Sequence, residues 1–180
     1  MKTKSRFQSA RRALIFWTLF IGVGAVAGAV CMLLDPSGRR MGYVKKVAYA
    51  EAARTGACLY EIRATERTAG TAGFWWCGRF AMHRWDMPIA PVGIDLSEYG
   101  HVTVCYPIWV FSLAPPVRSF CRAAAGKIKE ADYISVHHTA GRYENAVREM
   151  DALLQLRHTG YRSISCKMGM FSEAEKVETA

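Results

Sequence analysis

The chain has 180 residues, with 24 Lys and Arg against 15 Asp and Glu, which gives a formal net charge of +9. That length allows one domain of ordinary size with a small additional element. No zinc-finger or RNA-recognition signature accompanies the positive charge, so the sequence argues against nucleic-acid binding. The six cysteines show no C-x-x-C or Cys/His metal spacing, which favours free thiols in a reducing compartment over disulfides or a metal site.

The N-terminal part predicts a membrane anchor. A basic segment, residues 1–12, precedes an apolar segment, residues 13–34, that contains no charged side chain. At a rise of 1.5 Å per residue, a helix of this length crosses a hydrocarbon core of about 30 Å. Trp17 near one end and glycines such as those of Gly24-x-x-x-Gly28 are common in membrane helices. We therefore expect a single transmembrane helix over residues 13–34.

Two alternatives to that anchor stay open. Ala27-x-Ala29 resembles a signal-peptide cleavage site, and Cys31 resembles a lipoprotein cysteine, although Val30 is a poor residue immediately before one. Residues 26–34 could instead form the first strand of a soluble sheet. Basic residues flank the apolar segment on both sides, so the positive-inside rule does not fix its orientation. The free cysteines favour a soluble domain on the cytoplasmic side.

The first half of the remaining chain predicts two helices and one strand. Residues 35–44 are expected to form a juxtamembrane linker or an altered phosphate loop, and a helix is expected over residues 45–54, ending at Thr55-Gly56. Residues 57–62 have the pattern of a strand. An irregular stretch follows, with a short helix around residues 74–83. Its tryptophans are expected either to pack as a small satellite cluster or to meet a membrane interface, where indole is favoured: Trp75, Trp76 and Trp85.

The second half alternates strand and helix. Strands are expected over residues 102–105, 132–136 and 161–166, and helices from Pro115-Pro116 to about residue 125 and over residues 142–154. Such alternation predicts an open, mostly parallel sheet with helices on both faces. We expect this domain to span residues 45–171 and to be followed by a polar tail, residues 172–180. In such sheets ligands bind beyond the carboxyl ends of the strands.

Three stretches resemble the flavodoxin family. Residues 106–120, YPIWVFSLAPPVRSF, are similar to its second flavin-contacting loop, in which a Trp or Tyr lies beside the isoalloxazine ring. Residues 45–62 resemble its first helix and second strand. Residues 134–154 resemble its fourth strand, third flavin-side loop and following helix. The resemblance implies an FMN-binding electron carrier or small oxidoreductase that exchanges electrons with a redox protein or a small-molecule acceptor.

The resemblance also implies which residues contact FMN. Trp109 provides an apolar wall for the flavin, and His137 begins the third loop, whose backbone N–H groups and aromatic ring face the other side of the flavin. The remaining cofactor-binding candidates in these loops are Tyr106, Pro107, Ile108, His138, Thr139, Ala140, Gly141 and Tyr143. We find no nucleophile–base pair, paired carboxylates or P-loop, so any redox chemistry would be that of the cofactor.

The chain departs from the family at the phosphate loop and the first strand. The family loop S/T-x-T-G-x-T aligns with residues 39–44, where Gly42 matches and the hydroxyl side chains are absent. The first strand would coincide with the end of the apolar segment, so the domain either lacks that strand or completes its sheet with another chain. The sequence thus leaves two functions: a membrane-anchored FMN protein, or a membrane-tethered interaction module without flavin.

Overall fold

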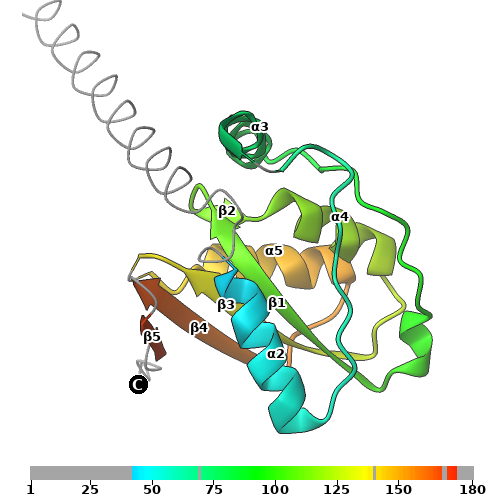
Figure 1. Cartoon of the computed structure of the whole chain (residues 1–180). Coiled ribbons are helices and arrows are strands. Elements are labelled where there is room, and N and C mark those ends of the chain that lie inside the picture. Colours follow the sequence, from blue (N-terminus) through cyan, green and yellow to red (C-terminus); the bar gives the residue numbers. More distant parts are fainter. Residues whose placement is uncertain (1–41, 69, 140, 168–169, 174–180) are drawn as a thin grey trace, which may run out of the picture. The chain divides into compact units, whose positions relative to one another are not determined.

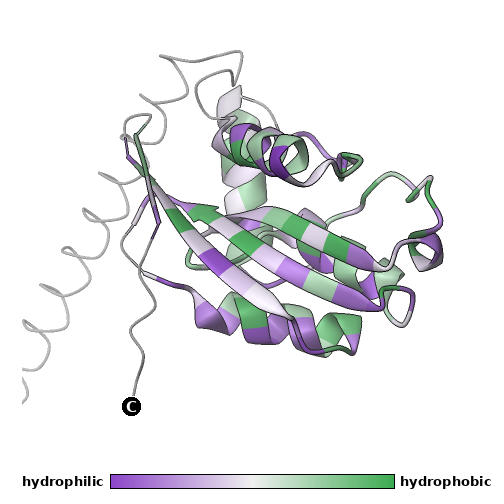
Figure 2. Cartoon of the chain, turned by 90° about the horizontal axis from the view of Figure 1, so that it is seen from below, coloured by the Kyte–Doolittle hydropathy of each residue, from purple (hydrophilic) through white to green (hydrophobic). Residues whose placement is uncertain are grey.

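The computed structural model contains a five-stranded sheet with helices on both faces (Figures 1 and 2). The structure describes residues 42–68, 70–139, 141–167 and 170–173, all within a unit formed by residues 40–180. Within these ranges no helix combines the length and the apolar character needed to cross a bilayer. The predicted anchor, residues 13–34, lies outside the described residues.

The sheet has parallel strands in its centre and an antiparallel strand at each edge. Its order is β2-β1-β3-β4-β5. β1 (His101–Trp109), β3 (Glu130–His137) and β4 (Gly160–Lys167) are parallel, while β2 (Ser112–Leu113) and β5 (Met170–Glu173) pair antiparallel with β1 and β4. The predicted mostly parallel sheet is therefore confirmed, and its two short edge strands are antiparallel. β5 includes Ser172 and Glu173, the first two residues of the predicted polar tail.

Three helices cover the two faces of the sheet. α2 (Tyr43–Thr55) lies on one face against β1 and β3, while α4 (Pro115–Ala124) and α5 (Glu144–Leu154) pack together on the other. α3 (Gly70–Met82) packs against α4 and β2, and a short 3-10 helix, Leu96–Glu98, precedes β1. The helices predicted over residues 45–54, 74–83, 115–125 and 142–154 all exist, with ends that differ by a few residues.

The hydrophobic core lies between the sheet and the α4–α5 layer. Alternate side chains of β1 and β3 point to this layer, because successive side chains of a strand face opposite sides of the sheet. α4 begins with two prolines, which a first helical turn tolerates. The core residues from these elements include Val104, Tyr106, Val117, Phe120, Cys121, Ala131, Tyr133, Ala146, Val147 and Met150.

Ion pairs hold α2 on the opposite face, where none of its side chains is buried. Arg162 on β4 reaches Glu51 on α2 at 3.0 Å (Nη1–Oε2) and Glu173 on β5 at 2.8 Å (Nε–Oε1). Arg54 also donates to Glu51, and this hydrogen bond, with the nearby positive charges, lowers the pKa of the Glu51 carboxyl despite its partial burial. Gly56 adopts a left-handed φ of 71° and ends the helix as the sequence predicts.

The strand predicted over residues 57–62 is wrong. This segment is extended but pairs with no strand of the described sheet; instead the following residues run beside residues 88–93, with an isolated bridge between Ala64 and Ile89. Tyr60 accepts a hydrogen bond from the Gly93 backbone N–H at 3.1 Å. Residues 101–107 of β1 pair with β3 and with no other described strand. The first strand of the family, which would lie on the other side of β1, is therefore absent from the described sheet.

Candidate functional site at the carboxyl edge of the sheet

Two of the predicted loops meet at the carboxyl ends of the parallel strands. β1 ends at Trp109 and β3 ends at His137, and the two strands are adjacent and parallel, so the segments that follow them leave the sheet at the same edge (Figure 1). The Asn145 side chain at the start of α5 donates to the Phe111 carbonyl at 3.2 Å. This contact ties the segment after β1 to the segment after β3.

The segment after β1 is a two-residue hairpin turn. Trp109 pairs with Ser112, and the intervening Val110 and Phe111 have φ of 48° and 59°. A hairpin turn with both central residues at positive φ normally uses Asn or Gly, because other residues pay a steric cost there. Both side chains are exposed. The turn therefore presents apolar side chains on a strained backbone, next to the half-buried Trp109.

The segment after β3 is organised around a buried histidine. His137 Nδ1 lies 2.8 Å from the Thr139 carbonyl, which only accepts hydrogen bonds, so Nδ1 carries the proton. Nε2 then accepts from the Ser163 hydroxyl at 2.8 Å, as in a neutral imidazole. Burial lowers the pKa of His137, in accord with this neutral form. The Tyr143 ring packs edge-on against His137 at 5.0 Å between centroids, and its hydroxyl bonds to Thr139.

The N-terminus of α2 lies at this same edge. Tyr43, its first residue, packs edge-on against Phe171, which pairs with Cys166 near the end of β4. Gly42 caps the helix without a side-chain hydrogen bond, and the first turn carries no acidic residue but contains Lys45 and Lys46. The initial N–H groups of a helix have no intrahelical partner and favour negative charge. This end of α2 thus provides positive electrostatic potential.

The structure separates the predicted FMN contacts into three groups. Tyr106 is fully buried in the core beneath α4 and α5, and its predicted contact with a flavin stays a prediction. Pro107 does not end the strand, which continues through Ile108 to Trp109; these three side chains are half-buried. The exposed or partly exposed residues at the edge are Gly42, His138, Thr139, Gly141 and Tyr143, while Ala140 lies outside the described residues.

Sequence reasoning missed the residues that fix these loops. Asn145, Ser163 and Tyr161 contact them from α5 and β4. The Tyr161 hydroxyl donates to the Arg142 carbonyl and bonds to Ser135 at 2.8 Å. No local pattern marks such contacts, because they join residues that are far apart in the sequence. The expected parallel order of the strands indicates only that the loop after β3 has neighbours on β4, and it does not indicate which residues these are.

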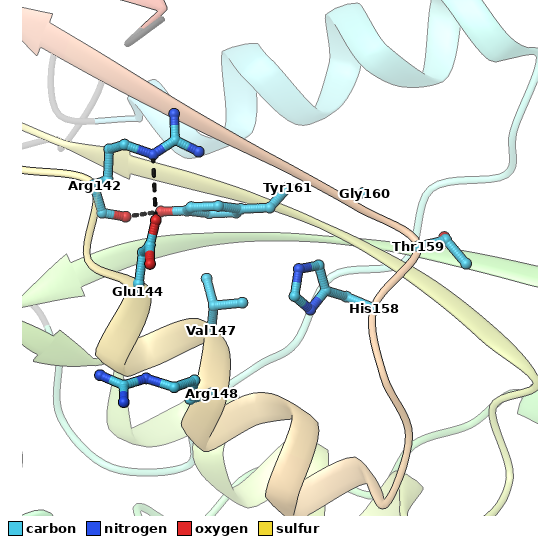
Figure 3. A pocket seen from close by; sticks show the side chains of 8 residues that line it. All are labelled: Arg142, Glu144, Val147, Arg148, His158, Thr159, Gly160 and Tyr161. Carbon is cyan, nitrogen blue, oxygen red and sulfur yellow. Dashed lines mark hydrogen bonds and ion pairs between the residues drawn. The ribbon is translucent and has the colours of Figure 1, made fainter. Parts of the chain in front are cut away.

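A separate cavity of about 270 Å³ lies between α5 and β4. At one end His158 Nδ1 is 2.9 Å from an Asp151 oxygen, an ion pair when the histidine is protonated. None of the residues predicted to contact FMN lines this cavity. Figure 3 shows the side chains that do: Arg142, Glu144, Val147, Arg148, His158, Thr159, Gly160 and Tyr161.

The part of the chain that the structure describes offers neither a metal centre nor a reactive thiol at Cys105 or Cys121. No group of three or more His, Cys, Asp or Glu side chains there could hold a metal ion. Burial raises the pKa of the Cys105 thiol to about 11 and that of the Cys121 thiol to about 12. Thiols with such pKa values are poor nucleophiles near neutral pH. The carboxyl edge therefore stays the principal candidate site.

Comparisons with known proteins support the fold. No family model matches the sequence, and no curated protein matches it. Among solved structures, the chain is similar to a flavoprotein from Lactobacillus acidophilus NCFM that was crystallised in complex with FMN. The two share 19% sequence identity and a TM-score of 0.52 over 72% of this chain and 87% of the other. This likeness, with the parallel β1, β3 and β4 between helices, is consistent with a flavodoxin-like fold.

Proposed function

We propose that this chain is a flavodoxin-like module that binds FMN along the carboxyl edge of its sheet and takes part in electron transfer. The observation that carries the proposal is a convergence: the Trp109 turn, the loop from His137 to Tyr143 and the N-terminus of α2 all lie at this one edge. The similar flavoprotein was crystallised with FMN, which supports the same ligand here. When bound, FMN supplies one- and two-electron redox chemistry.

The chemistry of the edge fits the parts of FMN unequally. Trp109 and Tyr143 are aromatic side chains that can pack against a planar flavin. For the phosphate, the N-terminus of α2 offers backbone N–H groups beside Lys45 and Lys46. These groups can bind an anion, but they would have to do so without the hydroxyl donors that the family's phosphate loop provides. We therefore expect the phosphate to contribute less to the affinity than the isoalloxazine ring.

His137 acts in this proposal as a positioning residue. Its buried ring hydrogen-bonds to the Thr139 carbonyl and to the Ser163 hydroxyl. These bonds fix the backbone of the loop after β3, which would face the flavin. Because burial lowers its pKa, the ring stays neutral near pH 7 and adds no positive charge beside the flavin. The redox partner would be either a protein or a small-molecule electron acceptor.

The alternative function is a flavin-free interaction module, and one observation favours it. The first turn of α2 has no side-chain cap, and residues 39–44 lack the hydroxyl side chains with which the family's loop holds its phosphate. A chain that has lost these donors could keep the fold without the cofactor. In either case we propose that residues 13–34 anchor the chain in a membrane as a single pass, with the domain on the cytoplasmic side.

Titration with FMN and with riboflavin distinguishes the two functions. The full chain in mild detergent should quench the fluorescence of both flavins, with FMN bound less than about tenfold more tightly than riboflavin, a difference of about 1.4 kcal/mol. Lys45→Gln should lower the affinity for FMN several-fold and leave riboflavin unchanged, and Arg157→Gln is the matched control on an exposed arginine that lines no part of the edge. A folded chain that quenches neither flavin would instead support the flavin-free module.

A further inference from the structure

Helix α3 is apolar on the side that faces away from the domain. Its inward side buries Gly73, Cys77 and Ala81 against the neighbouring elements. On the opposite side Trp75 is 54% exposed and Met82 is 69% exposed. Arg79 is the one charged residue in the helix. A surface helix normally carries polar residues on its outward side, so an apolar outward side indicates a partner.

The hairpin turn after β1 extends this apolar surface. The Ser112 hydroxyl beside the turn donates to the Ala81 carbonyl near the end of α3 at 3.4 Å, so the turn and the helix end are neighbours. Phe111 at the turn is 70% exposed. We name the combined surface the aromatic rim and define it by Trp75, Trp76, Met82, Trp85, Val110 and Phe111.

Arginines without an acidic partner surround the aromatic rim. Within the described residues Arg67, Arg79 and Arg84 have no carboxylate at ion-pair distance, whereas Arg118 and Arg162, like several other arginines, pair with acidic side chains. Two acidic residues also lie in this region: Glu66 accepts from the indole of Trp76, a rim residue, at 3.0 Å, and Asp86 pairs with Arg122 at 2.8 Å. The rim therefore combines indole rings with three arginines that have no ion-pair partner among the described residues, against one carboxylate, Glu66, that pairs with no cation there.

These properties favour a lipid surface over a second copy of the chain. In a symmetric dimer the same patch lies on both sides of the interface, so Arg67, Arg79 and Arg84 would face a second set of the same arginines and repel it. An anionic bilayer attracts arginine side chains, and indole rings are favoured at the level of the lipid headgroups. The rim therefore has the composition of an interfacial membrane element.

We propose that the aromatic rim docks on the headgroup region of an anionic phospholipid bilayer. The arginines contact the anionic headgroups, and Trp75, Met82 and Phe111 enter the boundary between headgroups and acyl chains. The inference rests on the membrane anchor proposed above and does not depend on FMN binding, so the flavin titrations and the membrane experiment below can fail separately.

Quenching of a single tryptophan by brominated lipids tests this docking. The full chain is reconstituted into vesicles of phosphatidylcholine and phosphatidylglycerol whose acyl chains carry bromine. One variant keeps Trp75 alone, with the other four tryptophans replaced by Phe. The control variant replaces all five and carries Tyr99→Trp, just before β1 at the opposite edge of the sheet. Circular dichroism verifies that both variants are folded.

We expect the brominated lipids to quench Trp75 at least twice as strongly as the tryptophan at position 99. Arg79→Gln with Arg84→Gln should reduce the quenching of Trp75 by half or more, while Arg148→Gln with Arg157→Gln, which removes the same charge elsewhere, should not. Equal quenching at the two positions would overturn the proposal. So would a Trp75 shielded from iodide but not reached by brominated lipid, which would assign the rim to a second copy or another protein.

Discussion

Replacing Arg118 should destabilise the whole domain, because this buried arginine joins four elements. Its side chain is almost completely buried, and Nε lies 2.5 Å from an oxygen of Glu149 on α5. Nη1 donates to the Trp85 carbonyl after α3 at 3.2 Å, and Nη2 donates to the Leu113 carbonyl on β2 at 3.3 Å. Arg118→Met keeps much of the side-chain volume but removes every one of these donors.

The expected loss follows from the partners that remain. Removing one member of a buried ion pair costs about 3–5 kcal/mol, because the other charge and the buried carbonyls lose their partners. Glu149 is 24% exposed, so water can solvate its carboxylate in part, and we expect about 3 kcal/mol. At roughly 2–4 °C per kcal/mol for a domain of this size, the midpoint of thermal unfolding should fall by about 6–12 °C.

A neighbouring arginine supplies the control. Arg122 lies one turn further along α4 and pairs with Asp86 at 2.8 Å, but both side chains are well exposed. Exposed pairs contribute about 0–1 kcal/mol, so Arg122→Met should change the free energy of unfolding by less than about 1 kcal/mol. Urea unfolding followed by circular dichroism measures both variants. Equal stabilities for Arg118→Met and Arg122→Met would refute the claim that the buried contacts of Arg118 stabilise the domain more than an exposed ion pair does.

Three further predictions follow from the backbone, the buried histidine and the thiols. Val110→Gly should raise the free energy of unfolding in urea by about 1 kcal/mol, since it removes a β-branched residue at φ 48°, and an unchanged or lower value would speak against strain in the turn. Burial lowers the pKa of His137, so the unfolded chain binds a proton that the folded chain does not, and stability should fall as the pH drops through about 6.5. His137→Gln should flatten this part of a plot of melting temperature against pH. An unchanged slope would contradict the buried neutral ring. Iodoacetamide should alkylate the exposed Cys58 in the native protein but Cys121 only after unfolding, and rapid native labelling of Cys121, mapped by mass spectrometry, would be inconsistent with its burial.

The sequence predicted helices well where local chemistry marks their ends. Gly56 ends α2 in the left-handed conformation, and Pro115 begins α4 at a position where the missing N–H costs nothing. The strand at residues 57–62 failed for a different reason. A local pattern can indicate an extended segment, but it contains no information on whether a sheet edge is free to pair with it.

Turn chemistry and sheet faces explain what else could not be predicted. The hairpin of β1 and β2 was missed because Val110 and Phe111 are among the least suitable residues for positive φ. The burial of Tyr106 could not be predicted, because the sequence does not reveal which face of β1 two helices will cover. The meeting of the loops after β1 and β3 could be predicted, since it follows from the parallel order alone. The contact from Asn145 to the turn could not, because it depends on how α5 packs.

The retention of FMN by the full chain tests the central proposal most directly. The protein is purified in mild detergent, incubated with FMN and dialysed, and its absorption spectrum is recorded beside those of Trp109→Ala and Trp75→Ala. We expect about one flavin per chain to remain with the wild type and with Trp75→Ala, and little with Trp109→Ala, because only Trp109 ends β1 at the proposed site. A folded wild-type chain that loses all its flavin on dialysis would contradict the account.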